Sequence, residues 1–373
     1  MQLTQQQIDY CMECGVCTGS CPISYDRPGF SPRQMIKRTL VEPDGDILQS
    51  NDLWACLSCS RCSDRCPVGI DFPKFIRTYR EKALAAANVP RKSHHGIFQT
   101  ITSLQAGSLQ QKRADWAREA GKISDTGEYF LFVGCLPYQN VVFEYLDLAM
   151  LDVARSVLTI LNRMGIEPVV SDDERCCGHD AFWGGEEELF ASLARKNVET
   201  IRESGAQTVI FICPEGYSIF RESYPDIVGE LGFDIIHISE FLARKMPQAD
   251  LDFTATTNGK VTYHDPCRLG RRTGIYEEPR QLIGMVPGAE FREMENNREN
   301  AVCCGTTAWM ECSSCSKTMQ IQRLKEAERA GADTIITACP KCQIHLSCAK
   351  SNTEIDVEIK DLYVYLSENI QEI

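Results

Sequence analysis

The most constraining feature of this 373-residue sequence is a cysteine motif that occurs twice near the N-terminus. Both copies follow the pattern C-x2-C-x2-C-x3-C-P, over residues 11–22 and 56–67. Three cysteines spaced two residues apart can reach three irons of one metal–sulfur cube from a single curling loop, while the fourth points toward the other cluster. We therefore predict two cubane [4Fe–4S] clusters. Their ligands are Cys11, Cys14, Cys17 and Cys66 (the first cubane set) and Cys56, Cys59, Cys62 and Cys21 (the second cubane set).

The motif leaves a zinc ribbon as an alternative, because zinc sites also use C-x2-C pairs. Zinc needs four ligands in two pairs and has no use for a third cysteine followed by C-P, repeated twice. The full run is used by two-cluster bacterial ferredoxins, which favours iron–sulfur clusters. Helices are predicted over residues 31–40, with Ser31 as N-cap and Pro32 in the first turn, and over residues 72–87. Residues 1–85 should form an all-helical ferredoxin module, followed by a helical linker over residues 86–127.

Composition disfavours several classes of protein. The formal net charge of −13 argues against binding to nucleic acid or to anionic membrane surfaces. Residues 1–5 lack the basic start of a signal peptide. The apolar pattern over residues 141–164 predicts one helix, but its acidic and basic residues exclude a membrane span. Twenty cysteines without a secretory signal indicate metal binding in a reducing compartment, so we expect a cytoplasmic protein.

From residue 128 onward, strand-like apolar runs alternate with helices. Strands are predicted over residues 129–134, 168–170 and 208–212, and helices over residues 141–164 and 186–203. This alternation implies a mainly parallel sheet covered by helices. The pattern then recurs at an offset of roughly 130 residues, as expected for an internal repeat. We predict two pseudo-symmetric α/β lobes, the first over residues 128–250 and the second over residues 251–373.

The repeat carries cysteines with it. The first lobe contains Cys135, Cys176, Cys177 and Cys213 (the first-lobe set). The second lobe repeats these and adds a fifth, giving Cys267, Cys303, Cys304, Cys339 and Cys342 (the second-lobe set). Open α/β sheets bind ligands at the carboxyl ends of their strands, so both sets should face one crevice. Five thiolates exceed the need of one cubane or one zinc. The position that matches Cys342 is Gly216, so the first lobe could hold a four-thiolate cluster, a smaller cluster or nothing, and we favour a cluster.

A family resemblance rests on these motifs. Cys176-Cys177-Gly178, Cys303-Cys304-Gly305 and Cys339-Pro340-Lys341-Cys342, behind the double cysteine run, resemble the heterodisulfide reductase catalytic family. The order resembles its C subunit fused to its B subunit, which is the layout of its D subunit. Iron–sulfur subunits of anaerobic glycerol-3-phosphate dehydrogenase, glycolate oxidase and the benzoyl-CoA reductase complex share this architecture.

The resemblance covers nearly the whole chain. It implies that the second-lobe set binds a noncubane [4Fe–4S] cluster. In the reductase, two such clusters cleave a disulfide that joins coenzyme M to coenzyme B. Gly216 leaves only one complete noncubane site in this chain.

Other residues keep more than one interpretation. His179 could replace the missing ligand of the first lobe, and His264 could donate a hydrogen bond near the second-lobe cluster or be a core histidine. Basic residues near the crevice could neutralise clusters or an anionic substrate; these are Lys341, Arg268, Arg271 and Arg272. The remaining polar candidates fit surface or structural roles better than metal ligation; these are His94, His95, Cys312, Cys315 and Cys348. No glycine-rich nucleotide fingerprint follows a strand, so neither flavin nor haem is expected.

These observations support two hypotheses. In the first, the chain is an electron-relay subunit of a larger oxidoreductase, with a flavoprotein or a membrane cytochrome subunit as partner. Electrons enter at one cubane, cross to the other and reach the second-lobe set. In the second, the chain is a catalytic subunit that reduces a disulfide or related thiol substrate at that set. Gly216 favours the relay, and no catalytic residue is assigned.

Overall fold

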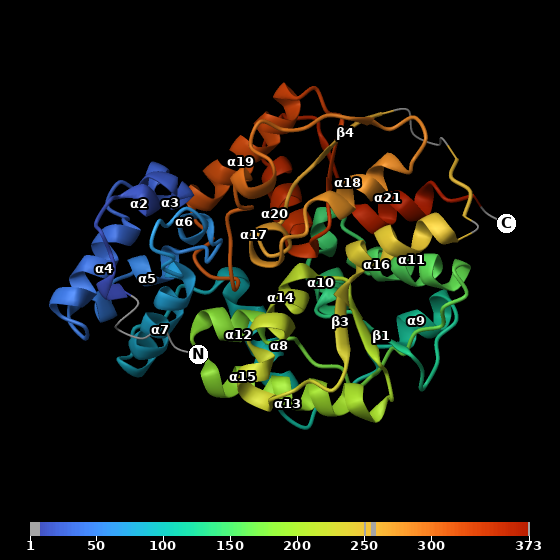
Figure 1. Cartoon of the computed structure of the whole chain (residues 1–373), viewed down its shortest axis with the longest axis horizontal. Helices are drawn as coiled ribbons and strands as arrows, with labels where there is room; N and C mark the ends of the chain where they lie inside the picture. The colour runs from blue at the N-terminus through green and yellow to red at the C-terminus, as the bar shows by residue number, and fades with distance from the viewer. Residues whose placement is uncertain (1–7, 250, 255–258, 372–373) are drawn as a thin grey trace.

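The structure, a computed structural model, describes residues 8–249, 251–254 and 259–371 (Figure 1). Residues 1–5, on which the signal-peptide expectation depends, lie outside these ranges. The N-terminal module and the linker are built from helices. These are α2 (Val16–Ser20), α3 (Pro22–Asp26), α4 (Pro32–Val41), η1 (Asp46–Gln49), α5 (Asp52–Ala55), α6 (Arg61–Asp64), α7 (Phe72–Ala85), η2 (Ser93–Gly96), α8 (Ile97–Ala106) and α9 (Asp115–Ala120).

Local sequence explains where the two longer helices of the module begin. Ser31 caps α4 by accepting a hydrogen bond from the backbone N–H of Gln34, and Pro32 occupies its first turn. Asp71 caps α7 in the same way through the backbone N–H of Lys74. Both predicted helices are confirmed, with small differences at their ends.

The first lobe contains a parallel three-stranded sheet in the order β1-β2-β3. Its elements are β1 (Tyr129–Phe132), α10 (Leu136–Val142), η3 (Glu144–Leu146), α11 (Met150–Arg163), α12 (His179–Gly184), α13 (Glu187–Glu203), β2 (Thr208–Phe211), α14 (Pro214–Glu222), α15 (Tyr224–Val228), β3 (Asp234–His237), α16 (Ile238–Lys245) and η4 (Met246–Gln248). β1 and β2 are buried beyond their first residue, which agrees with their continuous apolar sequences.

The second lobe repeats this sheet and adds one edge strand, in the order β5-β4-β6-β7, with all pairs parallel. Its elements are β4 (Lys260–Tyr263), α17 (Gly270–Thr273), α18 (Glu277–Gly284), β5 (Glu290–Phe291), η5 (Arg298–Asn300), α19 (Ser314–Arg329), β6 (Thr334–Thr337), α20 (Pro340–Lys350), β7 (Glu358–Asp361) and α21 (Leu362–Glu368). The predicted architecture, a helical module followed by two α/β lobes, is therefore confirmed.

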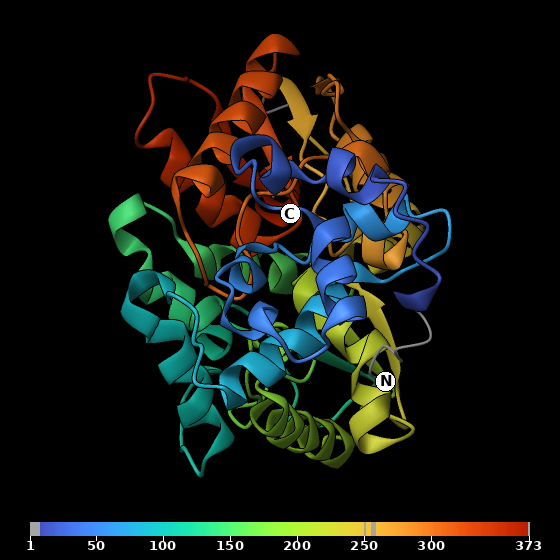
Figure 2. The same ribbon diagram turned by 90° about the vertical axis from the view of Figure 1, so that its left-hand side faces the viewer.

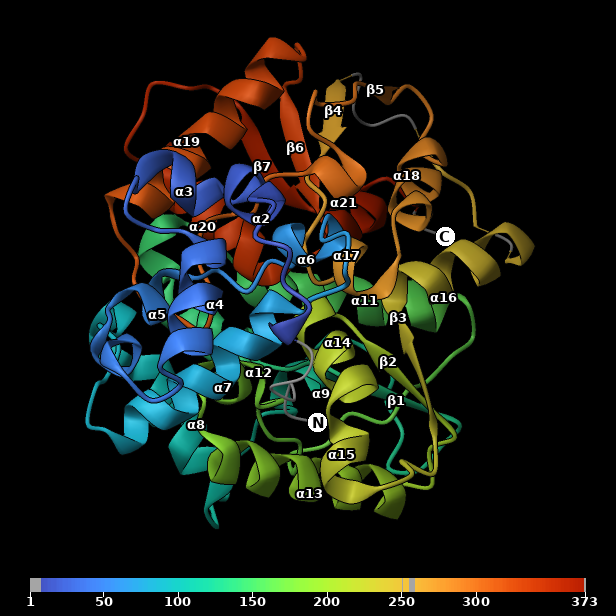
Figure 3. The same cartoon turned by 60° about the vertical axis from the view of Figure 1, so that its left-hand side comes forward.

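The lobes interlock, and the helical module lies across both of them. α21 of the second lobe packs against α11 of the first, and α16 packs against α18. Figure 2 shows the blue N-terminal module in front of both lobes. In Figure 3, α7 lies beside α12 of the first lobe. The loop before α6 contacts α17 of the second lobe, where Arg271 donates to the carbonyl of Cys59 and Arg272 to the hydroxyl of Ser60. This arrangement brings the two cysteine runs of the module toward the carboxyl ends of the strands.

Two predicted elements of the first lobe were wrong. The single helix over residues 141–164 is divided into α10, η3 and α11, because Asp147 adopts a left-handed backbone (φ 55°) that no α-helix accommodates. The strand over residues 168–170 is reduced to an isolated bridge of Val169 with Phe130 and with Ser124. In both cases the residues of the apolar pattern are buried against neighbouring elements, but they do not form one regular helix or strand.

We expect Gly185→Ala to loosen the contact between the helical module and the first lobe. Gly185 ends α12 at φ +84°, and an added Cβ would lie 2.6 Å from the backbone N of Glu81 and 2.9 Å from the carbonyl carbon of Arg80 in α7. Since helix backbone cannot yield as a side chain does, the two helices must separate. Overpacking of this kind costs about 1–3 kcal/mol in addition to the cost of the left-handed backbone.

Gly165→Ala is the matched control, because Gly165 has a similar φ of +74° but nothing within 4 Å of an added Cβ. The thermal unfolding midpoint of each variant, with limited proteolysis of the linker, checks the prediction. Equal midpoints and equal cleavage rates would show that the contact is not tight.

Among the described residues, no helix combines the length and the apolar character that a bilayer crossing requires.

Candidate metal centres

The two cysteine runs of the module fold into equivalent loops. Glu13 and Gly15 have left-handed backbones (φ 50° and 81°), and the matching residues Ser58 and Ser60 do too (φ 50° and 64°). Such conformations for residues other than glycine are costly and mark functional loops. In the second loop, the backbone N–H of Ser58 also lies 3.4 Å from the sulfur of Cys56 as a hydrogen-bond donor. The repeated sequence motif is thus a repeated backbone structure that curls around its cysteines.

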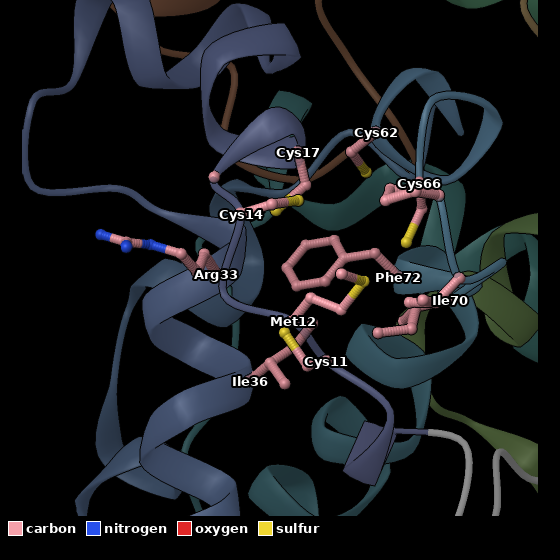
Figure 4. Close-up of a pocket in the computed structure, with 13 residues that line it drawn as sticks. Cys11, Met12, Cys14, Cys17, Arg33, Ile36, Cys62, Cys66, Ile70 and Phe72 are labelled. Atoms are coloured by element: carbon pink, nitrogen blue, oxygen red, sulfur yellow. The ribbon is translucent and has the colours of Figure 1, made fainter.

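The first cubane set lines one cavity of the module (Figure 4). Its four cysteines surround this cavity together with Met12, Ile36, Ile70 and Phe72, which are largely apolar, and Cys62 also reaches its wall. Cys14 is exposed to solvent, whereas Cys11, Cys17 and Cys66 are partly buried. The guanidinium group of Arg33 points away from the sulfurs in Figure 4. One side of this set is therefore open to the surface.

The second cubane set lies deeper in the molecule. Cys56, Cys59 and Cys62 are buried, and Cys21 from the first run joins them. Burial raises the pKa of the Cys21 thiol to about 12, and the neighbouring thiols of Cys59 and Cys56 add to this. The structure thus brings Cys21 to the second run and Cys66 to the first. That each of these cysteines binds iron stays a prediction.

The second-lobe set forms a continuous series of interacting thiols. Cys303 interacts with Cys267 and Cys304, Cys304 with Cys342, and Cys342 with Cys339. Cys303 also interacts with Cys59 of the second cubane set, whose pKa is lowered by that contact. The five predicted cysteines are therefore gathered in one place, directly against the module.

Local structure positions Cys304, Cys339 and Cys342 of this set. Cys339 is the N-cap of α20, with Pro340 in the first turn, so that Cys342 falls one turn later on the same face. Gly305 adopts φ +87°, and an added Cβ would lie 2.8 Å from the carbonyl oxygen of Ser316. The C-C-G motif therefore needs glycine for close approach to α19. Gln320 donates a hydrogen bond to the carbonyl of Cys304 at 3.1 Å.

Two imidazoles flank Cys304. The Nδ1 atom of His345 lies 3.5 Å from the sulfur of Cys304. His264 is fully buried, and its Nδ1 accepts a hydrogen bond from Nε of Arg323 at 3.0 Å, which places its proton on Nε2. The pKa of the Cys304 thiol is held well below its usual value, first by Cys303 and Cys342 and then by both histidines. Because metals bind thiolates, this environment suits a ligand.

The first-lobe set is also gathered and equally well supported. The sulfurs of Cys135 and Cys176 lie 3.8 Å apart, and Cys176 interacts with Cys177. Cys213 is the N-cap of α14, as Cys339 is of α20, and the two thiols interact across the lobe boundary. The two lobes therefore place their cysteines in one shared region.

Buried polar groups hold the backbone of this set in place. Glu174 accepts hydrogen bonds from the backbone N–H groups of Val133 and Gly134, just before Cys135, and forms a buried ion pair with Arg113 at 2.8 Å. Asn197 donates to the carbonyl of Cys176 at 3.0 Å, and the Tyr224 hydroxyl donates to that of Cys177 at 3.0 Å. The hydrogen bonds of Glu174, Asn197 and Tyr224 argue against a decayed remnant.

A buried ion network joins the lobes beside these sets. The Lys341 ammonium lies 2.7 Å from carboxylate oxygens of both Asp180 and Glu215. His179 lies 2.9 Å from Asp180, and its Nε2 accepts a hydrogen bond from Nε of Arg268 at 3.0 Å. Burial alone would lower the pKa of Lys341, but the two carboxylates raise it well above its usual value. His179 is thus engaged in this network, and Lys341 occupies the cation position between the carboxylates.

Buried polar atoms without a hydrogen-bond partner indicate whether these sites suit anionic metal–sulfur groups. Nε2 of His264 and Nη2 of Arg271 are buried donors without a hydrogen-bond partner among the described residues. His264 interacts with Cys304, and Arg271 is next to Cys59, Cys267 and Cys303. Buried donors of this kind require acceptors, and the sulfur atoms of a cluster would supply them. The residues present fit iron–sulfur groups.

Three cysteines lie outside the four sets. The ammonium of Lys317 lies 3.0 Å from the sulfur of Cys348, Cys315 is 3.9 Å from Asp26, and Cys312 precedes α19. Of the histidine pair, His95 is exposed and His94 is half-buried against the rings of Phe143 and Trp309.

Sequence reasoning missed several residues near the sets, among them Asp180, Glu215, His345 and Arg80. One of them left a signal. Glu215 and Lys341 occupy equivalent positions after the two C-P pairs, with opposite charge, and pair with each other across the lobes.

Comparisons with known proteins agree with this organisation. The family described as a 4Fe-4S dicluster domain matches residues 7–70, and the family described as a cysteine-rich domain (CCG) matches residues 129–220 and 261–347. The chain is 28% identical over 393 residues to the D subunit of dihydromethanophenazine:CoB--CoM heterodisulfide reductase from Methanosarcina acetivorans, covering 97% of this chain and 94% of that one.

Two more distant similarities extend the comparison. The B subunit of fumarate reductase (CoM/CoB) from Methanothermobacter marburgensis is 30% identical over 58% of this chain and 40% of its own length. A crystal structure of a hypothetical protein from Helicobacter pylori has a TM-score of 0.58 at 12% identity, covering 99% of this chain and 74% of that one, which reflects a shared fold.

Proposed function

We propose an electron-relay role for this chain, which is an iron–sulfur oxidoreductase subunit of the heterodisulfide reductase type with a 4Fe-4S dicluster domain followed by two CCG domains. Electrons from a partner subunit enter at the first cubane set, pass to the second cubane set and reach a noncubane cluster on the second-lobe set. The partner is a flavoprotein or a membrane cytochrome subunit. Similar chains are named as subunits of larger reductases, which is consistent with a partner.

One contact carries this proposal. Cys59 of the second cubane set lies near Cys303 of the second-lobe set, although the two cysteines are far apart in the sequence. Arg271 joins their two loops, because it donates hydrogen bonds to the carbonyl of Cys59 at 2.8 Å and to that of Ala301, two residues before Cys303, at 2.7 Å. The two sets are therefore neighbours, which suits direct electron transfer between the metal centres that they would hold. At the other end of the series, exposed Cys14 opens the first cubane set to a partner.

Iron–sulfur clusters would supply one-electron carriers at these sites. The residues of the chain bind them through thiolates, exclude water from the second cubane set by burial, and direct N–H donors at sulfur, as the backbone of Ser58 does at Cys56. The first-lobe set would hold a further cluster. This further cluster would have a secondary part in the relay, because the first lobe has Gly216 where the second lobe has the thiolate of Cys342.

Disulfide reduction at the second-lobe set is the second candidate. It is favoured by the contact between Cys213 and Cys339, which brings the sets of both lobes together at one point. A heterodisulfide is named for the similar D subunit. Reduction of a disulfide needs two electrons and two protons, and yields two thiols.

A two-part experiment separates relay from catalysis. In the first part, reduced bacterial ferredoxin serves as donor, because a protein cannot reach the buried second-lobe set directly. If the chain is a relay, the paramagnetic signal of the reduced second-lobe set should appear quickly in the wild type. It should appear slowly in a Cys62→Ser variant, whose second cubane set is incomplete. Equally fast reduction of both proteins would reject the relay.

In the second part, the heterodisulfide of coenzyme M and coenzyme B is added to the oxidised protein, and electron paramagnetic resonance is recorded. The relay predicts an unchanged spectrum. A new paramagnetic species would replace the relay with the catalytic function.

A further inference from the structure

Four arginine side chains converge on the loop that carries the second cubane set. Arg80, from α7, donates hydrogen bonds to the carbonyls of Leu53 (2.9 Å) and Cys56 (2.6 Å). The other three follow Cys267 in the second lobe. Arg268 donates to the carbonyl of Ser58, Arg271 to that of Cys59 at 2.8 Å, and Arg272 to the hydroxyl of Ser60 at 3.3 Å. The segment 53–60 thus accepts hydrogen bonds from four guanidinium groups.

Three of these four cations have no carboxylate partner among the described residues. Arg272 is paired with Glu222 and with Asp71. The hydrogen bonds of Arg80, Arg268 and Arg271 go instead to carbonyl oxygens, a hydroxyl and an imidazole, all of them neutral. Arg80 and Arg268 are fully or almost fully buried. Buried charges are normally paired, because an unpaired one loses its hydration without compensation.

Arg271 occupies the junction between the module and the second lobe. Its guanidinium group donates to the carbonyls of Cys59 at 2.8 Å and Ala301 at 2.7 Å, and its charge acts on the thiols of Cys59, Cys267 and Cys303. Nε and Nη1 donate to backbone carbonyls, whereas Nη2 is buried without a partner. A charged donor is therefore free to interact with the sulfur atoms of a cluster held by Cys59.

The first cubane set has no comparable surroundings. Among the residues that line its cavity, Arg33 is the one that carries a formal charge, and its guanidinium group points away from the sulfurs (Figure 4). Solvent reaches this set at Cys14. Burial alone would make the second cubane set the harder of the two to reduce, since reduction adds negative charge. Three cations without a carboxylate partner oppose that effect, of which Arg80 and Arg268 are buried and Arg271 is partly buried.

We propose that Arg80, Arg268 and Arg271 act as fixed counter-charges that hold the reduction potential of the second cubane above that of the first, so that electrons move toward the second lobe. This inference rests on the relay function proposed above. One electron leaves the first cluster, which is oxidised, and enters the second, which is reduced, and no atom is transferred. Arg271 is a positioning residue: it places a fixed positive charge beside the cluster and acts on it through the electric field of that charge.

The test is a redox titration of the complete protein followed by electron paramagnetic resonance, in which each reduced cubane is quantified separately. Arg271→Gln keeps a donor for the carbonyl of Cys59 but removes the charge, and Arg271→Lys keeps the charge. We expect Arg271→Gln to shift the electron distribution from the second cubane to the first by roughly tenfold, equivalent to about 59 mV for a one-electron couple. Arg271→Lys should retain most of the wild-type distribution. Arg38→Gln, at a surface pair with Asp46, is the control and should change nothing.

Equal potentials in wild type and Arg271→Gln would overturn the inference. Equal shifts in the Gln and Lys variants would also overturn it, because loop geometry and not charge would then be responsible. If Arg271→Gln fails to assemble, Arg268→Gln tests the same charge effect from the other side of the loop. Failure of the relay function would look different, because the second-lobe signal would then appear equally fast in the wild type and in the Cys62→Ser variant, whatever the two cubane potentials are.

Discussion

Replacing Cys304 with alanine should abolish the paramagnetic signal of the second-lobe centre and leave both N-terminal clusters intact. Cys304 is the middle member of the second-lobe set, between Cys303 and Cys342 in the series of thiols, and Nδ1 of His345 lies 3.5 Å from its sulfur. Its loss removes a thiolate whose pKa is held well below its usual value and separates the remaining four. The cubane sets are unaffected, because Cys304 belongs to neither. Electron paramagnetic resonance of the oxidised and reduced protein, with iron analysis, measures the effect.

Cys348→Ala is the matched control for this variant. Cys348 lies on α20, the helix that also carries Cys342, but its sulfur contacts Lys317 and not the second-lobe set. It should keep all signals and the full iron content. If Cys304→Ala keeps the second-lobe signal, or if both variants lose it equally, the assignment of the noncubane site is wrong.

Restoring the missing thiolate of the first lobe should create a second centre of the same kind. Gly216 lies in the first turn of α14 behind Cys213, as Cys342 lies in α20 behind Cys339. An added Cβ at Gly216 would lie 3.8 Å from Cβ of Cys177 and 3.3 Å from the ring of Phe211, which must shift by a few tenths of an ångström. The Gly216→Cys thiol would then be placed toward Cys177, as Cys342 is toward Cys304. We expect the noncubane signal to approach twice its wild-type intensity per chain.

Gly216→Ser is the control, because serine has nearly the size of cysteine but supplies no thiolate. It should have the wild-type spectrum. Identical spectra of the Cys and Ser variants would mean that the first lobe differs from the second in more than this one residue. A candidate for such a difference is the ion network of Lys341 with Asp180 and Glu215, which borders the first-lobe set.

Local signals in the sequence predicted much of the fold. The N-cap and proline of α4 are adjacent residues, and the alternation of apolar runs with helices needs only short windows. The break within residues 141–164 was missed, because the apolar pattern continues across Asp147 while the backbone does not. Hydrophobic periodicity reports which residues are buried, and it does not report whether the helix between them is continuous.

The cysteine sets could be predicted because their spacing and their repeat are visible in one dimension. Their surroundings could not. Arg80 bonds the carbonyl of Trp183 across 103 positions of sequence, and His264 receives its hydrogen bond from Arg323, 59 positions away. Arginine on an ordinary helix is usually solvated, so nothing in its local sequence marked Arg80 as a buried cation beside a cluster loop. Contacts of this kind depend on how the module docks on the lobes.

The most direct test of the central claim is the iron, sulfide and zinc content of the anaerobically purified protein, combined with Mössbauer spectroscopy of the ⁵⁷Fe-labelled chain. We expect a brown protein with iron far in excess of zinc, two cubane subspectra and a distinct subspectrum for the second-lobe centre. A colourless, zinc-loaded protein, or iron without a component beyond the two cubanes, would contradict it.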